Sequence, residues 1–236
     1  MTLSRLFDVA VVGGGHAGIE AACAAVRMGL KTTLVTHDKT KIGEMSCNPS
    51  FGGIGKGHLL REVDALDGVA PRACDKSGLF FKVLNKSKGP AVWGPRAQIH
   101  RQGYKNELQK IIKNEYSNLE IIEDTVLDFE TDGNDKIRHL KLSNSVLDTK
   151  TVVLCTGTFL NGETHYGEVI KEEGRRGEKN FSGIGEKLQQ LINNRSRTGT
   201  PPRVRFDTIN WDHPDIRIIQ QDTRPEPFSY MNDRVE

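Results

Sequence analysis

The stretch Phe-Asp-Val-Ala-Val-Val-Gly-Gly-Gly-His-Ala-Gly, residues 7–18, decides the fold of this chain. Its first half, Phe7–Val12, has the apolar character of a strand, and the Ala-rich segment Ile19–Met28 that follows has helical spacing. A GxGxxG string by itself is a weak indication, but a strand before it and a helix after it are the context that dinucleotide binding requires. We therefore predict a βα unit that binds a nucleotide cofactor.

Each glycine of this turn has a separate physical task. Gly13 permits the tight turn, Gly15 lets the backbone approach a pyrophosphate, and Gly18 brings the helix close to the strand. The N-terminus of the helix then presents free backbone N–H groups to the anion. The residues predicted to hold the pyrophosphate are Gly13, Gly14, Gly15, His16, Ala17 and Gly18. The alternative is a glycine-rich turn without a ligand.

The second strand lacks the acidic residue that normally binds the ribose. Lys31–Thr36 is predicted as this strand, and Gly29 as the C-cap of the preceding helix. In dinucleotide-binding folds an Asp or Glu, about 20 residues past the glycines, hydrogen-bonds a ribose hydroxyl. Here Thr36 and His37 occupy that place and Asp38 follows. Either Asp38 reaches back, or something weaker holds the ribose.

Length and composition predict a globular protein with an ample core. The 236 residues suffice for one large domain, or for one domain and part of another. No apolar run approaches the ~20 residues that span a bilayer, and the mean hydropathy is -0.49, so we expect no membrane span. The six residues before the first strand leave no room for a targeting segment, so we expect that any such segment was removed, lost or never present. The formal charge of +2 neither demands nor excludes a nucleic-acid partner.

The cysteines are scattered without metal-ligand spacing or a disulfide pattern: Cys23, Cys47, Cys74 and Cys155.

Beyond the first βα unit, helical and strand-like patterns alternate. A second Gly-rich stretch, Ser46–Gly57, precedes a predicted helix, and an amphipathic helix follows residue 101. Between these helices, Ser77–Arg101 is predicted as a loop-like basic run. Short strands separated by turns are predicted from residue 119 to residue 154. A further helix is predicted over Ile184–Ile192.

The strand pattern near residue 150 predicts the fold class. Thr151–Leu154, followed by a Thr-Gly pair at 156–157, is typical of a buried strand that returns to the sheet after a β excursion, as in two-dinucleotide-binding flavoproteins. We predict an α/β fold: a Rossmann-like FAD-binding domain over residues 1–203, with a β-rich segment at about 119–150. After Pro201-Pro202 the sequence becomes polar and irregular, so residues 204–236 are predicted to begin a second domain that is incomplete here.

Several different short motifs follow one another along this first part of the chain. They are Gly-Gly-Gly-His-Ala-Gly at 13–18, Met-Ser-Cys-Asn-Pro at 45–49, Gly-Gly-Ile-Gly-Lys-Gly-His at 52–58, Glu-Val-Asp-Ala-Leu at 62–66, Lys-Gly-Pro-Ala-Val at 88–92, Arg-Ala-Gln at 96–98, Thr-Gly-Thr-Phe-Leu at 156–160 and Thr-Gly-Thr-Pro-Pro-Arg at 198–203. In this order they closely resemble the MnmG (GidA) family. The resemblance runs from about residue 7 to residue 203, and no single motif carries it.

The resemblance implies a function. Members of this family are FAD-dependent tRNA uridine 5-carboxymethylaminomethyl modification enzymes, with mitochondrial counterparts. With a MnmE-type GTPase they add an aminomethyl-type group to C5 of the wobble uridine. Methylenetetrahydrofolate supplies the carbon, FAD and NADH supply the redox chemistry, and a homodimer is typical. The segment Trp93–Ile99 resembles the mitochondrial, fungal-type members, which implies a mitochondrial location, or a cytoplasmic one if the source is bacterial.

Cys47 is the candidate catalytic residue. A thiolate that adds to a uracil ring beside the carbon to be alkylated creates an enolate-like nucleophile. Gly-rich backbone donors and Lys56 or His58 would lower the pKa of the thiol if the fold brings them close. From chemistry alone, this role and that of a small buried filler, as expected of Cys23 and Cys155, are equal alternatives. The resemblance favours catalysis.

Further site residues follow only from the resemblance. The backbone of Val126 matches a position that meets the adenine, and Ser182 matches another FAD contact. The chain departs from the family at His100, where Asp is usual, and in a lengthened loop over residues 175–182. The family's second functional cysteine, its NADH-binding segment and its helical partner-binding domain would lie beyond Glu236.

Three other functions remain open at this stage. One is a TrmFO-type tRNA uridine methyltransferase that uses folate and FAD. The second is an NAD(P)H:flavin oxidoreductase without a nucleic acid, and the third is an FAD-binding fragment without activity. The basic, aromatic-bearing stretch Lys82–Lys105 is a candidate contact for a tRNA anticodon arm, and the alternative there is an ordinary solvated face.

Overall fold

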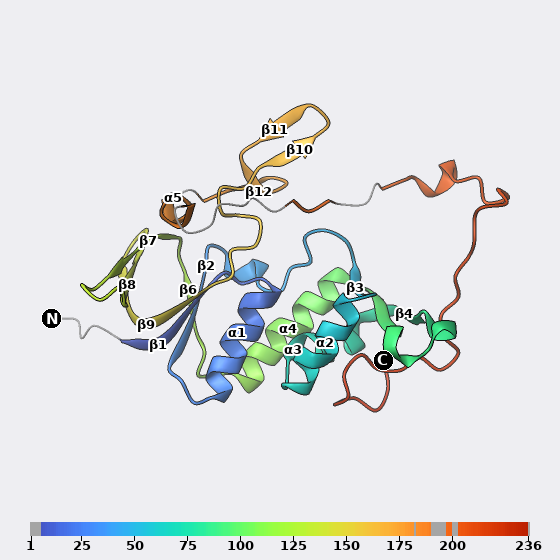
Figure 1. The fold of residues 1–236 in the computed structure, drawn as a ribbon, viewed down its shortest axis with the longest axis horizontal. Coiled ribbons are helices and arrows are strands. Elements are labelled where there is room, and N and C mark those ends of the chain that lie inside the picture. The colour runs from blue at the N-terminus through green and yellow to red at the C-terminus, as the bar shows by residue number, and fades with distance from the viewer. Residues whose placement is uncertain (1–5, 182, 190–196, 200–202, 236) are drawn as a thin grey trace. The chain divides into compact units, whose positions relative to one another are not determined.

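The computed structural model describes residues 6–181, 183–189, 197–199 and 203–235, drawn as a ribbon in Figure 1. The chain forms two compact units. The first unit comprises residues 1–44, 67–70 and 105–194, and the second comprises residues 45–66, 71–104 and 195–236.

A six-stranded sheet forms the centre of the first unit (Figure 1). Its strand order is β6-β2-β1-β9-β8-β7. The strands β6, β2, β1 and β9 run parallel to one another, and β8 and β7 continue the sheet in antiparallel fashion. The strand bounds are β1 Phe7–Val12, β2 Thr32–Thr36, β6 Glu120–Glu123, β7 Val126–Thr131, β8 Ile137–Leu142 and β9 Val146–Leu154. The α/β class and the mostly parallel centre of the sheet are therefore confirmed.

The buried strand β2 shows how polar residues are accommodated in this sheet. All five of its residues are buried, including three threonines. The Thr32 hydroxyl donates to the Leu30 carbonyl at 3.0 Å, and the Thr33 hydroxyl donates to the Glu120 carbonyl at 3.0 Å. Because each hydroxyl has a partner, these β-branched residues keep their strand preference without a desolvation penalty.

The helix α1, His16–Arg27, packs against this sheet through a small-residue face. Its buried residues are Gly18, Ile19, Ala22, Cys23, Ala25 and Val26. Gly29 has a φ of 77° and ends the helix, with its N–H donating to the Val26 carbonyl at 2.9 Å. The predicted strand–turn–helix–strand unit is thus confirmed, but the C-cap residue is Met28, and Gly29, predicted as the C-cap, is the positive-φ glycine one position beyond it.

The β excursion returns to the sheet through a single long strand. The first half of β9 pairs with β8, and its second half, from Thr149 to Leu154, pairs with β1. The predicted return strand therefore begins earlier, at Val146, and it is less buried than expected, because Leu154 is 37% exposed. The excursion and β1 share one core, which contains Phe7, Ala10, Val12, Val35, Val126, Leu140, Leu142, Leu147 and Ile184.

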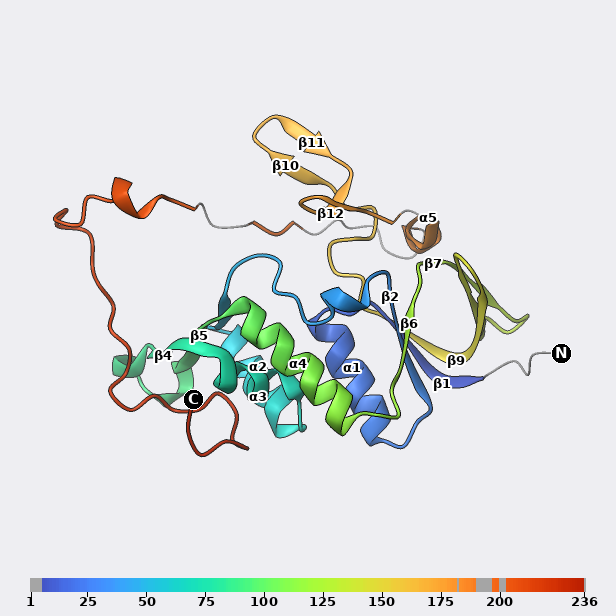
Figure 2. The same ribbon diagram turned by 180° about the vertical axis from the view of Figure 1, so that it is seen from behind.

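Two hairpins and a short helix follow β9. The hairpins join β10 Thr164–Tyr166 to β11 Val169–Lys171, and β12 Glu173–Arg175 to β13 Glu178–Lys179. Figure 2 shows the first hairpin from the reverse side. The helix α5 spans Gly183–Gln189, so the helix predicted over Ile184–Ile192 is confirmed up to residue 189, and residues 190–192 lie outside the described residues.

The second unit contains a three-stranded antiparallel sheet of order β3-β5-β4. Its strands are β3 Ser50–Gly52, β4 Gly78–Leu84 and β5 Gly94–Ile99, and the helices nearby in sequence are α2 Lys56–Ala65, α3 Val69–Ser77 and α4 Arg101–Glu115. The prediction of a loop over Ser77–Arg101 is wrong. The lysines and the Gly-Pro pairs suggested irregular structure throughout, whereas residues 78–84 and 94–99 are strands, because β5 pairs with both β4 and the more distant β3.

The buried carboxylate of Asp75 binds the C-terminal part of the second unit. Asp75 accepts hydrogen bonds from the backbone N–H groups of Phe228 and Ser229, at 2.5 and 2.9 Å, and from the Asn232 amide at 2.8 Å. The ring of Phe228 is 1% exposed and packs edge-on against Phe51. Residues 228–232 therefore belong to the same core as β3, while the predicted domain boundary at residue 203 stays a prediction.

Residues 221–222, slightly earlier in the chain, cover the edge of the three-stranded sheet at β4. The β4 amide groups of Phe81 and Val83 donate to the side chains of Gln221 and Asp222, at 3.0 and 3.1 Å. Side-chain oxygens thus satisfy backbone donors that a neighbouring strand would otherwise pair. No helix among the described residues is long and apolar enough to cross a membrane.

Asp75→Ala should lower the free energy of unfolding by about 3 kcal/mol or more, because it leaves two buried backbone donors without an acceptor. Asn232→Ala is the matched control. It removes one side-chain donor and should cost about 1 kcal/mol. Urea denaturation measures both values, and equal effects of the two substitutions would contradict this account.

Candidate functional site

The glycine turn joins three backbone segments at very close range. The Gly13 N–H donates to the Val35 carbonyl of β2 at 2.8 Å, and Gly13 has a φ of 111°. A Cβ atom at Gly13 would collide with the Cys155 carbonyl at the end of β9, and one at Gly18 would collide with the Gly13 carbonyl. Only glycine therefore lets β1, α1 and β9 meet at this point.

The N-cap residue of α1 provides no side-chain cap. Gly15 is its N-cap residue, with an extended backbone and no capping hydrogen bond, and the first turn carries no acidic residue. A Cβ atom at Gly15 would meet nothing within 4 Å. The N–H groups of a first helical turn, which lack intrahelical acceptors, the positive end of the helix dipole and the space beside Gly15 fit the diphosphate of a dinucleotide.

The acidic residue nearest to this helix end in the sequence is engaged elsewhere. Glu20 lies in the second turn of α1, and its carboxylate accepts from the N–H groups of Val69 and Ala70 at 3.1 and 2.8 Å. It thereby caps the first turn of α3. The charge of Glu20 is thus used to satisfy backbone donors of another helix.

The loop after β2 forms one wall of the turn. The Gly43 N–H donates to the Gly14 carbonyl at 3.0 Å, and a Cβ atom at Gly14 would lie 3.0 Å from the Ile42 side chain and 3.1 Å from the Thr36 hydroxyl. Six residues are predicted to hold the pyrophosphate. At three of them, Gly13, Gly14 and Gly18, neighbouring atoms leave little or no room for a Cβ atom. At Gly15 the space is open.

The other predicted cofactor contacts differ in how they are placed. Val126 begins β7, and its side chain is buried in the core of the first unit beside Leu142. Only its backbone is therefore available to a ligand, and its contact with an adenine stays a prediction. Ser182 lies outside the described residues.

Asp38 does not reach back to take the place of the missing ribose acid. Its carboxylate accepts from the Thr40 N–H at 2.8 Å and from the Thr40 hydroxyl at 2.6 Å. It thereby caps the short 3-10 helix η1, Lys39–Lys41, and the hydrogen bond from the Thr40 side chain lowers the pKa of Asp38. The last residue of β2 is Thr36, which is buried and carries a hydroxyl group. The end of this strand therefore offers no carboxylate to a ribose.

Cys47 lies in the second unit, in a turn that leads into β3. The Arg101 guanidinium donates to the Cys47 carbonyl at 2.9 Å, and the Asn48 side chain accepts from the Ser50 N–H at 3.1 Å. The Cys47 side chain is partly exposed, with the Ser46 hydroxyl 3.9 Å from its sulfur. The backbone that follows the thiol is therefore held in place, and the Cys47 residue is partly exposed.

The other cysteines have different surroundings. Cys23 and Cys74 are buried, and burial raises the pKa of Cys74. Cys155 is partly buried at the end of β9, and burial raises the pKa of its thiol as well. The expectation that Cys23 is a buried filler is confirmed, whereas Cys155 is only partly buried. The predicted influence of Lys56 or His58 on Cys47 stays a prediction, since the described contacts of Cys47 involve Ser46 and Arg101.

Gly15→Ala separates ligand binding from folding at the glycine turn. In the full-length protein it should change the free energy of unfolding by no more than about 1 kcal/mol, because its φ suits alanine and its surroundings are open. It should weaken FAD at least about tenfold, because the methyl group occupies the space that the diphosphate needs. Flavin fluorescence titration and urea denaturation measure the two effects.

Gly18→Ala is the contrasting variant at this turn. It should destabilise the fold by about 1–3 kcal/mol, because its Cβ atom meets backbone. Equal loss of stability in the Gly15 and Gly18 variants would contradict the assignment of Gly15 to the ligand.

Comparison with known proteins connects this geometry to a family. The sequence model of the family described as glucose inhibited division protein A matches residues 8–236. A mouse (Mus musculus) relative, the mitochondrial 5-taurinomethyluridine-[tRNA] synthase subunit MTO1, is 46% identical over 97% of this chain and 35% of its own length. The tRNA uridine 5-carboxymethylaminomethyl modification enzyme MnmG of Granulibacter bethesdensis is 48% identical over 98% of this chain and 37% of its own length.

A solved structure agrees with these sequence relatives. That of Aquifex aeolicus GidA matches with a TM-score of 0.87 and 40% identity, covering 97% of this chain and 38% of that one. The GidA-related protein of Thermus thermophilus, at 19% identity and a TM-score of 0.53, shares the fold. This chain spans little more than a third of the length of the curated relatives cited. With the family model matched along almost its whole length, the chain belongs to the glucose inhibited division protein A (GidA) family.

Proposed function

We propose that this chain is the FAD-binding part of an enzyme that modifies the wobble uridine of tRNA at C5. The observation that carries the proposal is the family match over residues 8–236, in a chain whose glycine turn fits a dinucleotide diphosphate. Relatives from a mitochondrion and from a bacterium are both named as tRNA uridine-modifying proteins. They differ in the group that is added, so the proposal names an aminomethyl-type group without choosing the amine.

FAD would lie across the opening βα unit and supply redox chemistry when bound. The Gly13 N–H is already bonded to the Val35 carbonyl, so the backbone N–H groups of residues 14–18 would bind the diphosphate, at the N-terminus of α1. The Val126 backbone and Ser182 are the proposed contacts further along the cofactor. The chain's own part in this chemistry is to bind and orient the cofactor.

Cys47 would activate the uridine. Its thiolate would form a bond to C6 of the uracil ring, and the electron pair of the C5–C6 double bond would move toward O4 as an enolate. C5 would then form a bond to the methylene carbon of methylenetetrahydrofolate, while one of the two C–N bonds of that carbon breaks and its electron pair stays on the folate nitrogen. Loss of the C5 proton and departure of the thiolate would restore the double bond. The partial exposure of Cys47 and the hydrogen bond from Arg101 to its carbonyl support this role.

The remaining participants are proposed from family membership. Methylenetetrahydrofolate and NADH would be co-substrates, and a MnmE-type GTPase would be the partner of a homodimeric protein. A mitochondrial location is proposed because several relatives are mitochondrial and the segment Trp93–Ile99 resembles such members.

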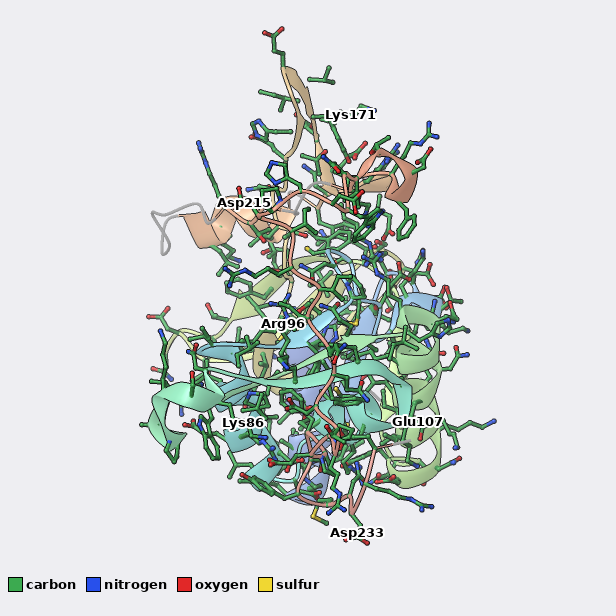
Figure 3. All side chains as sticks on the ribbon, turned by 90° about the vertical axis from the view of Figure 1, so that its right-hand side faces the viewer. Lys86, Arg96, Glu107, Lys171, Asp215 and Asp233 are labelled. Carbon is green, nitrogen blue, oxygen red and sulfur yellow. The ribbon has the colours of Figure 1, made fainter. Side chains whose placement is uncertain are left out.

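The hairpin formed by β4 and β5 is the proposed contact for tRNA. Its tip carries Lys86 and Lys88, both with exposed side chains, and Trp93, whose indole N–H donates to the Lys86 carbonyl at 3.1 Å. Figure 3 labels Lys86 in this tip and Arg96 on β5. A rigid loop that presents cations beside an aromatic ring suits phosphates and an unstacked base.

Cys47→Ser in the full-length protein should abolish the modified wobble nucleoside and leave FAD affinity unchanged, because a hydroxyl does not replace the thiolate nucleophile. Mass spectrometry of tRNA nucleosides from cells that depend on the variant measures the outcome. Ser46→Ala, which alters the neighbouring exposed side chain, should retain the modification. Full activity of Cys47→Ser would exclude an essential thiol at this position.

Deletion of the full-length gene tests the reaction itself. Wobble uridines that keep their modification would overturn the proposed function. Loss of a 5-methyluridine elsewhere in tRNA would instead favour a TrmFO-type methyltransferase.

Lys86→Glu combined with Lys88→Glu should weaken tRNA binding by at least about tenfold at low salt. It should also reduce the slope of log K against log salt by about 1.5, because two phosphate contacts are lost. Lys113→Glu with Lys136→Glu is the matched control, since it makes the same charge change at exposed positions of the first unit. Equal losses in both double variants would show a net-charge effect and contradict a specific contact.

A further inference from the structure

A carboxylate other than that of Asp38 lies next to the end of β2 in the first unit. His37 directly follows this strand, and its ring packs against those of Phe159 and Phe181, with a centroid distance of 5.1 Å to each. Its Nε2 atom is 3.6 Å from the Oε2 atom of Glu178, the first residue of β13. A residue about 140 positions away in the sequence therefore brings an acid to the place where the nucleotide fingerprint lacks one.

Glu178 is held in a fixed orientation. The Arg175 guanidinium binds it with both Nε and Nη2, at 2.7 and 2.9 Å, across the turn of the β12–β13 hairpin. This hydrogen bond from Arg175 is the main cause of a lowered pKa at Glu178. The carboxylate is therefore an ionised acceptor at neutral pH, and its side chain is 24% exposed and not sealed from a ligand.

Lys41 connects Glu178 with the glycine turn. The Lys41 ammonium is 3.7 Å from the Oε1 atom of Glu178. Lys41 immediately precedes Ile42 and Gly43, the residues that pack against Gly14. Glu178 thus lies between the residue that follows β2 and the segment that lines the diphosphate turn. In dinucleotide-binding folds the ribose of the adenosine occupies this neighbourhood.

We infer that Glu178 accepts hydrogen bonds from the ribose hydroxyls of the adenosine half of the cofactor, in place of the acid that is missing at the end of β2. This inference rests on the proposed function, because it requires an adenosine-containing cofactor at the glycine turn. A carboxylate has four lone-pair positions, so the bonds to Arg175 leave acceptor capacity for a cis-diol. Cofactor binding would then fasten the β12–β13 hairpin to the nucleotide site.

Paired nucleotides test this inference in the full-length protein. ADP and 2′,3′-dideoxy-ADP differ only in the ribose hydroxyls, and both can be measured by competition with FAD. The unaltered protein should bind ADP at least about tenfold more tightly than the dideoxy compound, since hydrogen bonds to a charged acceptor are strong. Glu178→Gln should bring this ratio close to 1 and leave the affinity for dideoxy-ADP unchanged.

Two further variants separate ribose binding from a structural role. Glu44→Gln is the matched control, because Glu44 is the other carboxylate of this network, paired with Lys41, Lys105 and Arg175, and it should keep the ratio. Glu178→Asp keeps the charge on a shorter side chain and should retain part of the ratio, even if Glu178→Gln fails to fold.

The outcomes distinguish this inference from the proposed function. A Glu178→Gln protein that weakens both nucleotides equally would show that the residue only closes the hairpin and would overturn the inference alone. The same holds if the unaltered protein binds both nucleotides equally. Failure of the unaltered protein to bind FAD or ADP would overturn the proposed function together with the inference.

Discussion

The contact among the backbones of Gly13, Gly18 and Cys155 is the constraint on which the first unit depends. At this point the end of β1, the start of α1 and the end of β9 approach one another without room for a Cβ atom. The same approach leaves the first N–H groups of α1 open beside Gly15. A packing requirement of the fold and a binding site for an anionic diphosphate are therefore produced by one piece of geometry.

Carboxylates perform a recurring task in both units, because they satisfy backbone N–H groups. Glu20 caps α3, Asp38 caps η1, and Asp75 holds the chain at residues 228–229. A carboxylate used in this way is an acceptor that the fold has already engaged. Glu178 differs, since its partners are cationic side chains and its position is beside the nucleotide turn. This difference is why a ligand role is inferred for Glu178 and not for Asp38.

The chemistry proposed for this protein requires a bound cofactor and an accessible thiol. The first unit offers the cofactor turn and the second offers Cys47, whose carbonyl is held by Arg101. A fixed backbone beside a partly exposed sulfur is what a nucleophile needs to meet a base that has left its stack. Family membership connects these separate features to one reaction on tRNA.

The sequence by itself determined the opening βα unit, the return of a strand near residue 151 and the identity of the glycines, because these depend on local spacing and on steric limits at single residues. It did not reveal β4 and β5, whose lysines and Gly-Pro pairs look like a loop until antiparallel pairing satisfies their backbones. Nor did it reveal that Glu178 lies beside His37. Tertiary contacts settle both points, because β5 also pairs with β3 far back in the chain and Glu178 meets His37 across the first unit, and neither contact has a local signature.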